Sequence, residues 1–471
     1  MTSTATSPAP DSPSSLPRMT QELGTAPADT GTPDPGPRGH IGWIVACSLA
    51  TGILAALLFV AAPFVPAEES DLTGAVLCGF ALGWAMLAVL SVRFTDQPQR
   101  WAAAPAVFMA VLGVASLSGS AAVLAALSWV WPPALLGLVV WLFLRMRRRL
   151  RSRGPRWLLY PVLAILMVAS IGGGLQTVSE TLDARAYPPP GQLVDVGGRK
   201  LHLHCTGSGS PTVVLEPGHG GSSSDWGWIA PAIARDSRVC VYDRAGRGWS
   251  DAAEGPQDAV QIAADLNTLL DRAHVPGPYL LAGHSFGGLY TLTFAARYPD
   301  RVAGMVLLDS TAPRPGPAPP TTGESFGVLG RFLAVAPAVA HLGVTRLIAQ
   351  IDGGLPPRSE VEARANVSTA HHLDSYIEEF LQGSTSMQQA AALTDLSDKP
   401  LIVLTADTGN DEAWRSAQDH LATLSTNSRH RVAKATTHGS MIADGADAGA
   451  ATQAIRDVVV SVRTSQPLAS R

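Results

Sequence analysis

The chain has 471 residues and a formal net charge of −4, and only 15% of its residues are charged whereas 46% are hydrophobic. A net negative charge gives no basic footprint for nucleic acid, so we expect no nucleic-acid partner. Four cysteines are too few for a disulfide scaffold and lack the close spacing of a zinc site, so we expect no metal. The shortage of charge is greatest between Ile41 and about Thr177, where acidic residues are almost absent.

Residues 1–40 form a tail that is rich in proline, serine and threonine and poor in large apolar residues. Such a segment cannot bury enough apolar surface to offset the entropy of folding. We therefore predict that 1–40 is disordered.

Five hydrophobic runs follow the tail, at 41–62, 72–92, 102–120, 122–144 and 157–178. Each is close to the roughly 20 residues that a helix needs to cross a bilayer. Buried helices of a soluble protein would carry a polar face, and these runs carry none. We predict a transmembrane domain of about five helices over 41–180, although 102–144 also fits one long span with a re-entrant segment.

The loops between these runs predict an orientation. Seven arginines lie between the fourth and fifth runs, at Arg145, Arg147, Arg148, Arg149, Arg151, Arg153 and Arg156. Such a cluster stays on the cytoplasmic side of a membrane. Arg93 and Arg100 then fall on the same side, and Glu68, Glu69 and Asp71 on the other. We therefore expect a multi-pass cell-membrane protein whose tail is cytoplasmic and whose following domain is extracytoplasmic.

From Gln192 the pattern becomes short apolar strands that alternate with amphipathic helices, as in an α/β sheet. The predicted strands are Leu193–Val196, Lys200–Cys205, Thr212–Leu215, Arg238–Tyr242, Tyr279–Ala282, Gly304–Leu308, Leu401–Thr405 and His430–Val432. Between about 311 and 396 the alternation stops and only helical patterns remain, so we predict a helical cap over the sheet.

The segment 283–287 reads Gly-His-Ser-Phe-Gly, a G-x-S-x-G pattern. Alone, the pattern could be a glycine-rich helix start. However, it directly follows the strand Tyr279–Ala282 and opens a helix that runs to Arg297, which is the context of a nucleophile elbow. We therefore predict that Ser285 is a catalytic nucleophile.

A serine hydroxyl needs a base to remove its proton, and the base needs an acid to orient it. His438 directly follows the last predicted strand and is the best-placed histidine for the base. For the acid we favour Asp309, at the end of its strand, over Asp411 and Asp407, which lie in the loop after a later strand.

The tetrahedral intermediate would carry an oxyanion that needs two N–H donors. One should be the backbone N–H of Phe286, directly after the nucleophile. The other should come from the glycine-rich loop Glu216–Gly221, where we favour the N–H of His219.

Together, these motifs resemble the α/β-hydrolase superfamily over about 190–465. The resemblance rests on Pro-Gly-His-Gly-Gly at 217–221, the Tyr-Asp-Arg-Ala-Gly-Arg-Gly-Trp-Ser-Asp segment at 242–251, the Ser285 elbow and His438, in that order. It implies a mostly parallel eight-stranded sheet with helices on both faces and a helical cap. The chain departs from the family where the usual His-Gly is Pro217-Gly218, and where Gly409 takes the position of the usual acid.

The resemblance implies the chemistry of a serine hydrolase without a metal or organic cofactor. Serine at the elbow disfavours epoxide hydrolases and haloalkane dehalogenases, whose elbows carry aspartate. We expect cleavage of an ester (a carboxylic ester, lipid or thioester) or an amide in a small-molecule or lipid acyl substrate, and carbon–carbon cleavage is a weaker possibility. The alternative is a non-catalytic membrane protein with a hydrolase-like binding domain, and the presence of Ser285 and His438 argues against it.

Cys205 and Cys240 fall on the second and fourth predicted strands, which this fold places side by side. Because the predicted topology puts them outside the reducing cytosol, we expect them to form a disulfide. Two buried free thiols are the alternative.

Overall fold

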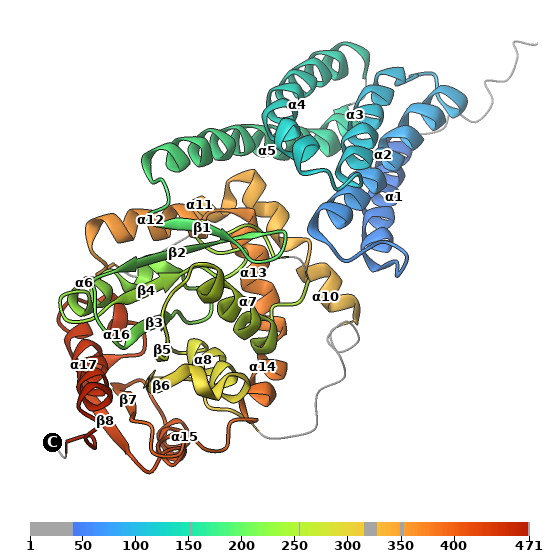
Figure 1. Ribbon diagram of the computed structural model, residues 1–471. Coiled ribbons are helices and arrows are strands. Elements are labelled where there is room, and N and C mark those ends of the chain that lie inside the picture. The colour runs from blue at the N-terminus through green and yellow to red at the C-terminus, as the bar shows by residue number, and fades with distance from the viewer. Residues whose placement is uncertain (1–40, 151–152, 254, 315–326, 349–352, 470–471) are drawn as a thin grey trace, which may run out of the picture.

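The computed structural model describes residues 41–469 except 151–152, 254, 315–326 and 349–352, and consists of a helical bundle followed by an α/β domain (Figure 1). The predicted disordered tail 1–40 lies outside the described residues. The bundle helices are α1 (Ile41–Ala61), α2 (Glu69–Phe94), η1 (Arg100–Ala102), α3 (Ala103–Ser116), α4 (Ala121–Arg149) and α5 (Arg153–Ala186).

Four of these helices, α1, α2, α4 and α5, are long and apolar enough to cross a membrane. The third hydrophobic run differs from the prediction, because its α-helix, α3, has only 14 residues. The helix ends at Ser116, and three residues later the chain turns at Gly119, which adopts a left-handed φ of +61°. Counted with η1, the helical stretch Arg100–Ser116 is about 25 Å long, near the lower limit for a span.

Helix α3 nevertheless runs back along most of α2. Near one end Trp101 lies beside Trp84 of α2, with ring centroids 6.3 Å apart. Near the other end the backbones touch, since a Cβ on Gly74 would lie 2.7 Å from the carbonyl oxygen of Gly113. Such close approach at small residues is typical of helix packing in membranes.

The two ends of the bundle differ in charge. The α1–α2 connection faces the α/β domain, where Glu69 pairs with His341 at 3.9 Å. Arg93 and Arg100 lie together at the opposite end. There Arg156 donates hydrogen bonds to carbonyl oxygens at the end of α4. Arg151 lies outside the described residues.

The α/β domain contains one eight-stranded sheet of order β1-β2-β4-β3-β5-β6-β7-β8. Its strands are β1 (Gln192–Asp195), β2 (Lys200–Thr206), β3 (Thr212–Glu216), β4 (Val239–Tyr242), β5 (Tyr279–His284), β6 (Val302–Leu308), β7 (Leu401–Thr408) and β8 (Ser428–Thr437). Strand β2 is antiparallel to both of its neighbours, and the remaining pairings are parallel. The prediction of a mostly parallel sheet is confirmed.

Helices cover both faces of the sheet, because the central strands are buried on both sides. One core forms under α7 (Ala259–Arg272) and α8 (Gly287–Arg297). The other forms under α6 (Ile229–Ile233) and α17 (Ala448–Thr464). The loops at the carboxyl ends of the parallel strands lie at one edge of this rigid layer.

The predicted helical cap follows β6, and its described residues contain helices and no strand. The cap helices are α10 (Gly327–Leu333), η4 (Ala336–Leu342), α11 (Val344–Ile348), α12 (Pro357–Val367), α13 (Ala370–Leu381) and α14 (Gly383–Ala390). Most of them lie between the sheet and the bundle, and α14 lies beside α8 (Figure 1).

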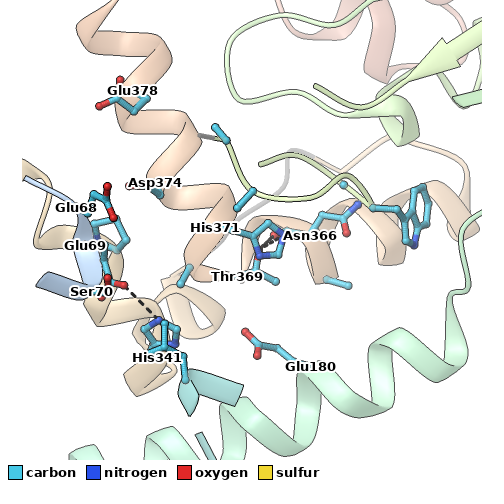
Figure 2. Close-up of a pocket in the computed structure, with 18 of the residues that line it drawn as sticks. Glu68, Glu69, Ser70, Glu180, His341, Asn366, Thr369, His371, Asp374 and Glu378 are labelled. Carbon is cyan, nitrogen blue, oxygen red and sulfur yellow. Dashed lines mark hydrogen bonds and ion pairs between the residues drawn. The ribbon is translucent and has the colours of Figure 1, made fainter. Parts of the chain in front are cut away.

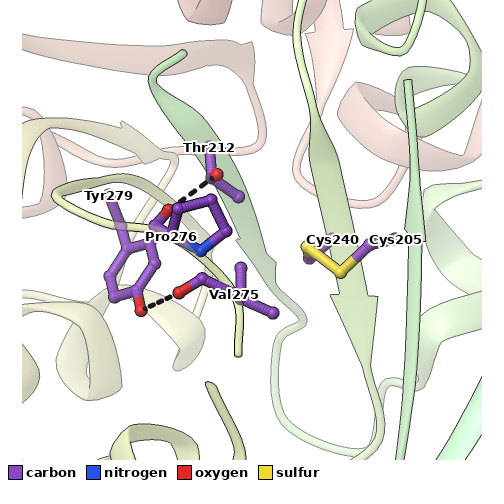
Figure 3. Close-up of a disulfide and its surroundings, with 6 residues drawn as sticks. All are labelled: Cys205, Thr212, Cys240, Val275, Pro276 and Tyr279. Atoms are coloured by element: carbon purple, nitrogen blue, oxygen red, sulfur yellow. Dashed lines mark hydrogen bonds between the residues drawn. A yellow bond between two sulfur atoms is a disulfide. The ribbon is translucent and has the colours of Figure 1, made fainter. Parts of the chain in front are cut away.

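The predicted disulfide is present: Cys205 of β2 and Cys240 of β4 are directly paired in the sheet and their sulfur atoms are bonded (Figure 3). Beside it, Thr212 donates a hydrogen bond to the carbonyl oxygen of Pro276, and Tyr279 donates one to that of Val275, at 2.9 Å each. These bonds attach the turn before β5 to the starts of β3 and β5, so the strand that leads to Ser285 is fixed at its entry.

Candidate active site

Ser285 lies in the sharp turn between β5 and α8, with a φ of +55°. A side chain rarely adopts this left-handed conformation, and such strain is characteristic of functional turns. Glycines allow the turn, since a Cβ on Gly287 would lie 2.3 Å from the carbonyl oxygen of Glu216. The N–H of Ser285 donates to Leu308 of β6 at 3.1 Å, so its backbone is anchored to the neighbouring strand.

His438 follows β8 and is oriented from its Nδ1 side. The distance from Nδ1 of His438 to Oδ2 of Asp309 is 2.6 Å. On another side its ring packs against the ring of His284, with centroids 4.7 Å apart, and His284 Nε2 lies 2.9 Å from the carbonyl oxygen of His438. Burial, followed by the proximity of His438, lowers the pKa of His284 to about 4, so this neighbour is neutral.

Asp309 is fully buried at the end of β6, and its second oxygen, Oδ1, is held by three donors. The donors are the N–H of Ala406 (3.2 Å), the amide of Asn410 (2.9 Å) and the indole of Trp414 (2.9 Å). Burial alone would raise the pKa of Asp309, but the hydrogen bonds from His438 and Trp414 outweigh it and lower the pKa. The carboxylate is therefore charged and fixed in place.

The two other acid candidates have structural roles. Asp411 is the N-cap of α15 (Glu412–Ala422), where it accepts a hydrogen bond from the N–H of Trp414 at 2.7 Å. Asp407 accepts one from the N–H of Ala435 at 3.1 Å. The structure thus brings Asp309 to His438 and uses Asp411 and Asp407 to shape the surrounding loops.

The predicted oxyanion residues lie on either side of Ser285. Phe286 is the next residue in the chain, and the loop that carries His219 approaches from β3. A Cβ on Gly218 would lie only 3.0 Å from the Cβ of Ser285. In the described part of the chain, neither the N–H of Phe286 nor that of His219 has a hydrogen-bond acceptor in the protein. Both donors are therefore free to bind a developing oxyanion.

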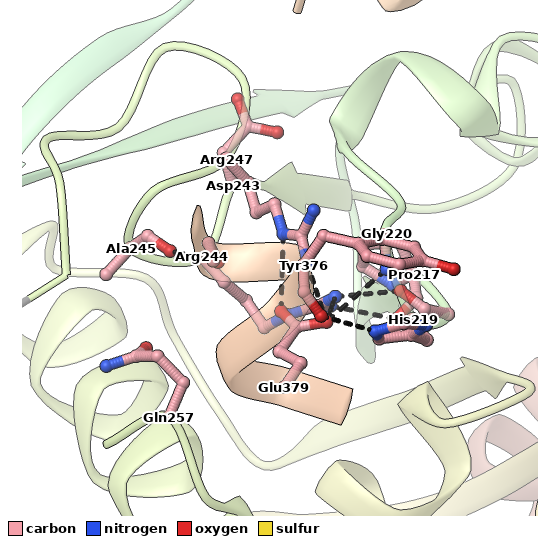
Figure 4. Close-up of polar contacts among 12 residues, drawn as sticks. Pro217, His219, Gly220, Asp243, Arg244, Ala245, Arg247, Gln257, Tyr376 and Glu379 are labelled. Atoms are coloured by element: carbon pink, nitrogen blue, oxygen red, sulfur yellow. Dashed lines mark hydrogen bonds and ion pairs between the residues drawn. The ribbon is translucent and has the colours of Figure 1, made fainter. Parts of the chain in front are cut away.

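Sequence reasoning missed a buried charged cluster behind this loop, which we call the arginine cluster: Arg244, Arg247, Glu216 and Glu379. Figure 4 shows Arg244, Arg247 and Glu379. Arg244 pairs with Glu216 at 2.7 Å and with Glu379 of α13 at 2.8 Å, and Arg247 pairs with Glu379 at 3.0 Å. The available signal was the pair Arg244 and Arg247 in the glycine-rich loop that follows the apolar strand β4.

The arginine cluster orients the loop Glu216–Gly221, which we call the oxyanion loop after its predicted role. Arg244 donates to the carbonyl oxygens of Pro217 (2.8 Å) and Gly218 (2.7 Å). The Gly218 carbonyl and the His219 N–H belong to one planar trans peptide and point in opposite directions. Since the carbonyl faces Arg244, the N–H of His219 faces away from it.

The pKa values of the two carboxylates in the arginine cluster are shifted in opposite directions. Burial would raise the pKa of Glu379, but Arg244 and Arg247 outweigh it and lower that pKa to about 2. Glu216, which also accepts a hydrogen bond from Tyr242, has its pKa raised to about 7, mainly by burial. Glu379 is thus the charged partner that both arginines share.

The side chain of His219 closes the site against the cap. Its ring packs on Tyr376 of α13, with centroids 4.0 Å apart, and on Phe286 at 5.4 Å. Its Nε2 lies 2.8 Å from the carbonyl oxygen of Tyr376. Burial lowers the pKa of His219. Through this ring the cap contacts the loop Glu216–Gly221 directly.

A separate cavity of about 1050 Å³ lies on the other face of α13, between the cap and the bundle (Figure 2). Its walls include Glu68 and Glu69 of the bundle, Glu180 of α5, and Asp374 and Glu378 of α13. Ser285 is not part of its wall. Across the described ranges of the chain, no group of three or more histidine, cysteine or acidic side chains is arranged to hold a metal ion.

Comparison with known proteins identifies the fold. Residues 211–361 match the family model described as alpha/beta hydrolase fold. An uncharacterised protein of Schizosaccharomyces pombe is 31% identical over 276 residues, which is 51% of this chain and 50% of that protein. The 2-hydroxy-6-oxo-2,4-heptadienoate hydrolase of Pseudomonas putida is 33% identical over 121 residues, 25% of this chain and 44% of the enzyme.

Solved structures of this fold include a thermophilic esterase from Thermogutta terrifontis, which is 24% identical and superposes with a TM-score of 0.43. The match covers 57% of this chain and 97% of the esterase. The chain spans half or less of the length of the two curated relatives.

Proposed function

Since the α/β domain of this chain belongs to the α/β-hydrolase superfamily, we propose that the protein is a membrane-anchored serine hydrolase. It cleaves an ester (a carboxylic ester, lipid or thioester) or an amide through an acyl-enzyme on Ser285. The observation that carries the proposal is the charged, buried Asp309 held 2.6 Å from His438, at the same sheet edge as a serine in a strained turn.

In the reaction, Oγ of Ser285 attacks the carbonyl carbon of the substrate while Nε2 of His438 takes the hydroxyl proton. Asp309 accepts the Nδ1–H of His438, which leaves Nε2 free to act as the base, and then stabilises the imidazolium. The substrate oxygen becomes an oxyanion between the N–H groups of Phe286 and His219. His438 returns the proton to the leaving group, and water releases the acyl group by the same steps.

We further infer that the bundle is a multi-pass membrane anchor with the hydrolase domain on the extracytoplasmic side. The separation of the arginine-rich end from the α/β domain supports this orientation, and so does the Cys205–Cys240 disulfide, because disulfides persist outside the reducing cytosol. A tag after Arg471 should be cut by protease added to intact cells. A tag that is cut only after lysis would reverse the orientation.

The catalytic proposal is tested with a fluorophosphonate probe on membranes that contain the full chain. The wild type should be labelled, and Ser285→Ala should not. Ser440→Ala is the matched control, since the Ser440 hydroxyl lies two residues from His438 and is engaged by the N–H of Thr437 at 2.9 Å. Labelling of Ser285→Ala at the wild-type rate would contradict the proposal, and esters graded by acyl length would define the substrate.

A further inference from the structure

The cap segment Gly327–Ile348, which we call the membrane-side cap segment, is attached to the ends of the bundle helices. Arg331 of α10 donates hydrogen bonds to the carbonyl oxygens of Val60 and Val65, at 2.6 Å each. Val60 lies in the last turn of α1, which ends at Ala61. Because the end of an apolar span marks the edge of the bilayer core, α10 lies at that level.

A second attachment lies deeper. A Cβ on Gly172 of α5 would lie 2.2 Å from the carbonyl oxygen of Leu342, so the backbones of α5 and the cap segment touch. Gly172 is six residues before Val178, where the hydrophobic run of α5 ends, and six residues of helix correspond to about 9 Å. The cap segment therefore reaches below the end of the apolar span.

The cations of the membrane-side cap segment bind the bundle. Arg331 binds the carbonyl oxygens at the end of α1, as described above. Arg346 pairs with Asp183 of α5 at 2.9 Å and donates to Gln176 at 3.1 Å. His341 pairs with Glu69. The segment contains no acidic residue. It therefore presents no carboxylate to the bilayer, and its positive charges point to protein acceptors.

Its apolar side chains point outward instead. Leu347 is 87% exposed, Ile348 67%, Leu329 59% and Val328 53%. Phe64, in the bundle connection on the same side, is 80% exposed. Exposed apolar side chains at both ends of the segment, in α10 and α11, suit contact with another apolar phase.

We propose that the membrane-side cap segment is immersed in the bilayer leaflet next to the hydrolase domain. The occupant of the apolar surface is lipid, because the contacts at Val60 and Gly172 place the segment at and below the end of the apolar spans. At Leu342 the immersion would be about 9 Å, which matches the depth to which amphipathic interfacial helices sink.

This placement also defines a substrate class, in an extension that rests on the proposed function. The same cap carries Tyr376, which holds His219 of the oxyanion loop. An acyl substrate that enters through the cap then comes from the leaflet, so the substrate is an amphiphilic lipid ester.

The insertion is tested with full-length protein in phosphatidylcholine nanodiscs. Single cysteines at Leu329→Cys and Leu347→Cys, in a Cys47→Ala/Cys78→Ala background, are labelled with the fluorophore NBD. Val460→Cys on α17 is the matched control, since Val460 is also apolar and 55% exposed but lies on the far side of the sheet. Quenchers are acyl-chain doxyl lipid and aqueous iodide.

Doxyl lipid should quench NBD at 329 and 347 severalfold more strongly than at 460, and iodide should show the reverse order. Iodide quenching at 329 and 347 equal to that at 460 would overturn the insertion. Protection from both quenchers would also overturn it, because it would show a protein partner or a second copy on this surface.

The substrate class is tested with Leu329→Asp and Leu347→Asp. Hydrolysis of an ester dispersed in the bilayer should fall at least tenfold, whereas hydrolysis of a water-soluble short-chain ester and fluorophosphonate labelling should stay within twofold. If the variants hydrolyse the bilayer ester at the wild-type rate, or lose activity on the bilayer ester and the soluble ester to the same extent, the substrate class is overturned. If the wild type is not labelled at all, the proposed function fails while the quenching result still decides the insertion.

Discussion

The carboxyl edge of the sheet and the junction between cap and bundle are held together in different ways. At the sheet edge, main-chain hydrogen bonds fix the candidate catalytic residues: the N–H of Ser285 donates to Leu308, and that of Asp309 donates to Leu404. At the junction, side chains such as Arg331 bind main-chain oxygens of another domain. The sheet itself thus positions the candidate catalytic residues, whereas the position of the cap above them depends on its attachment to the bundle.

Helix α13 separates these two regions, and its adjacent carboxylates show the contrast. Glu379 faces the arginine cluster, and its pKa is lowered to about 2. Glu378 faces the cavity, where burial followed by the charge of Asp374 raises its pKa. One helix therefore carries a carboxylate stabilised by arginines on the face toward the arginine cluster, and acids with raised pKa values on the face toward the cavity.

The largest expected effect is at the sheet edge. Asp309→Asn should lower turnover by on the order of 10⁴-fold, because the amide no longer accepts the Nδ1–H of His438 or stabilises its charge. Asp411→Asn should change turnover by less than about tenfold, since asparagine also caps helices well. Initial rates on a soluble ester check both variants. A larger loss in Asp411→Asn than in Asp309→Asn would assign the acid role to Asp411.

The second effect distinguishes the two faces of α13. Glu379→Gln leaves Arg244 and Arg247 buried with a single carboxylate, so the free energy of unfolding should fall by about 3–5 kcal/mol. Glu378→Gln, the matched control on the cavity face, should change it by less than about 0.5 kcal/mol. Thermal unfolding of the full chain in detergent measures both. Equal losses would mean that the two faces are not distinguished by charge pairing.

The smallest effect concerns pH at the junction. Burial, followed by the charges of Glu69 and Glu68, raises the pKa of Asp374 from 3.8 to about 6. Between these values the folded protein keeps a proton that the unfolded chain has lost, so stability should fall as pH rises from about 4 to 6 and then level off. Because Asp374 is partly exposed, the expected loss is only roughly 1 kcal/mol. The free energy of unfolding, measured at several pH values, should decline less between about pH 4 and 6 in Asp374→Asn than in the wild type. The same decline in both proteins would show that Asp374 is not its source.

Much of the fold could be predicted because its signals are local. Short apolar runs between turns predict each strand, and the order of strand, elbow and helix places Ser285 without knowledge of distant contacts. The same holds for Asp309, which directly continues β6. The third hydrophobic run was predicted to extend to 120, but its helix ends at Ser116 and the chain turns at Gly119.

What could not be predicted depends on contacts between distant residues. Arg244 and Glu379 are 135 positions apart, and nothing near either residue reveals its partner. The attachment of Arg331 to Val60 spans 271 positions and joins two domains. The apolar pattern of Gly327–Ile348 predicts helices but does not show which surface they meet.

Helix α5 has a further consequence for the proposed membrane-anchored hydrolase. It continues as one helix from the bundle to Ala186, and only a few residues separate it from β1. Gln176 of α5 also donates to Ser368 of the cap at 2.8 Å. A domain on a flexible tether samples a volume of solution, but a domain on a rigid helix stays at one height and one orientation. If the protein is anchored and cleaves an amphiphile of the same leaflet, as we propose, the search is two-dimensional, and lateral diffusion rather than movement of the hydrolase domain brings the reactants together.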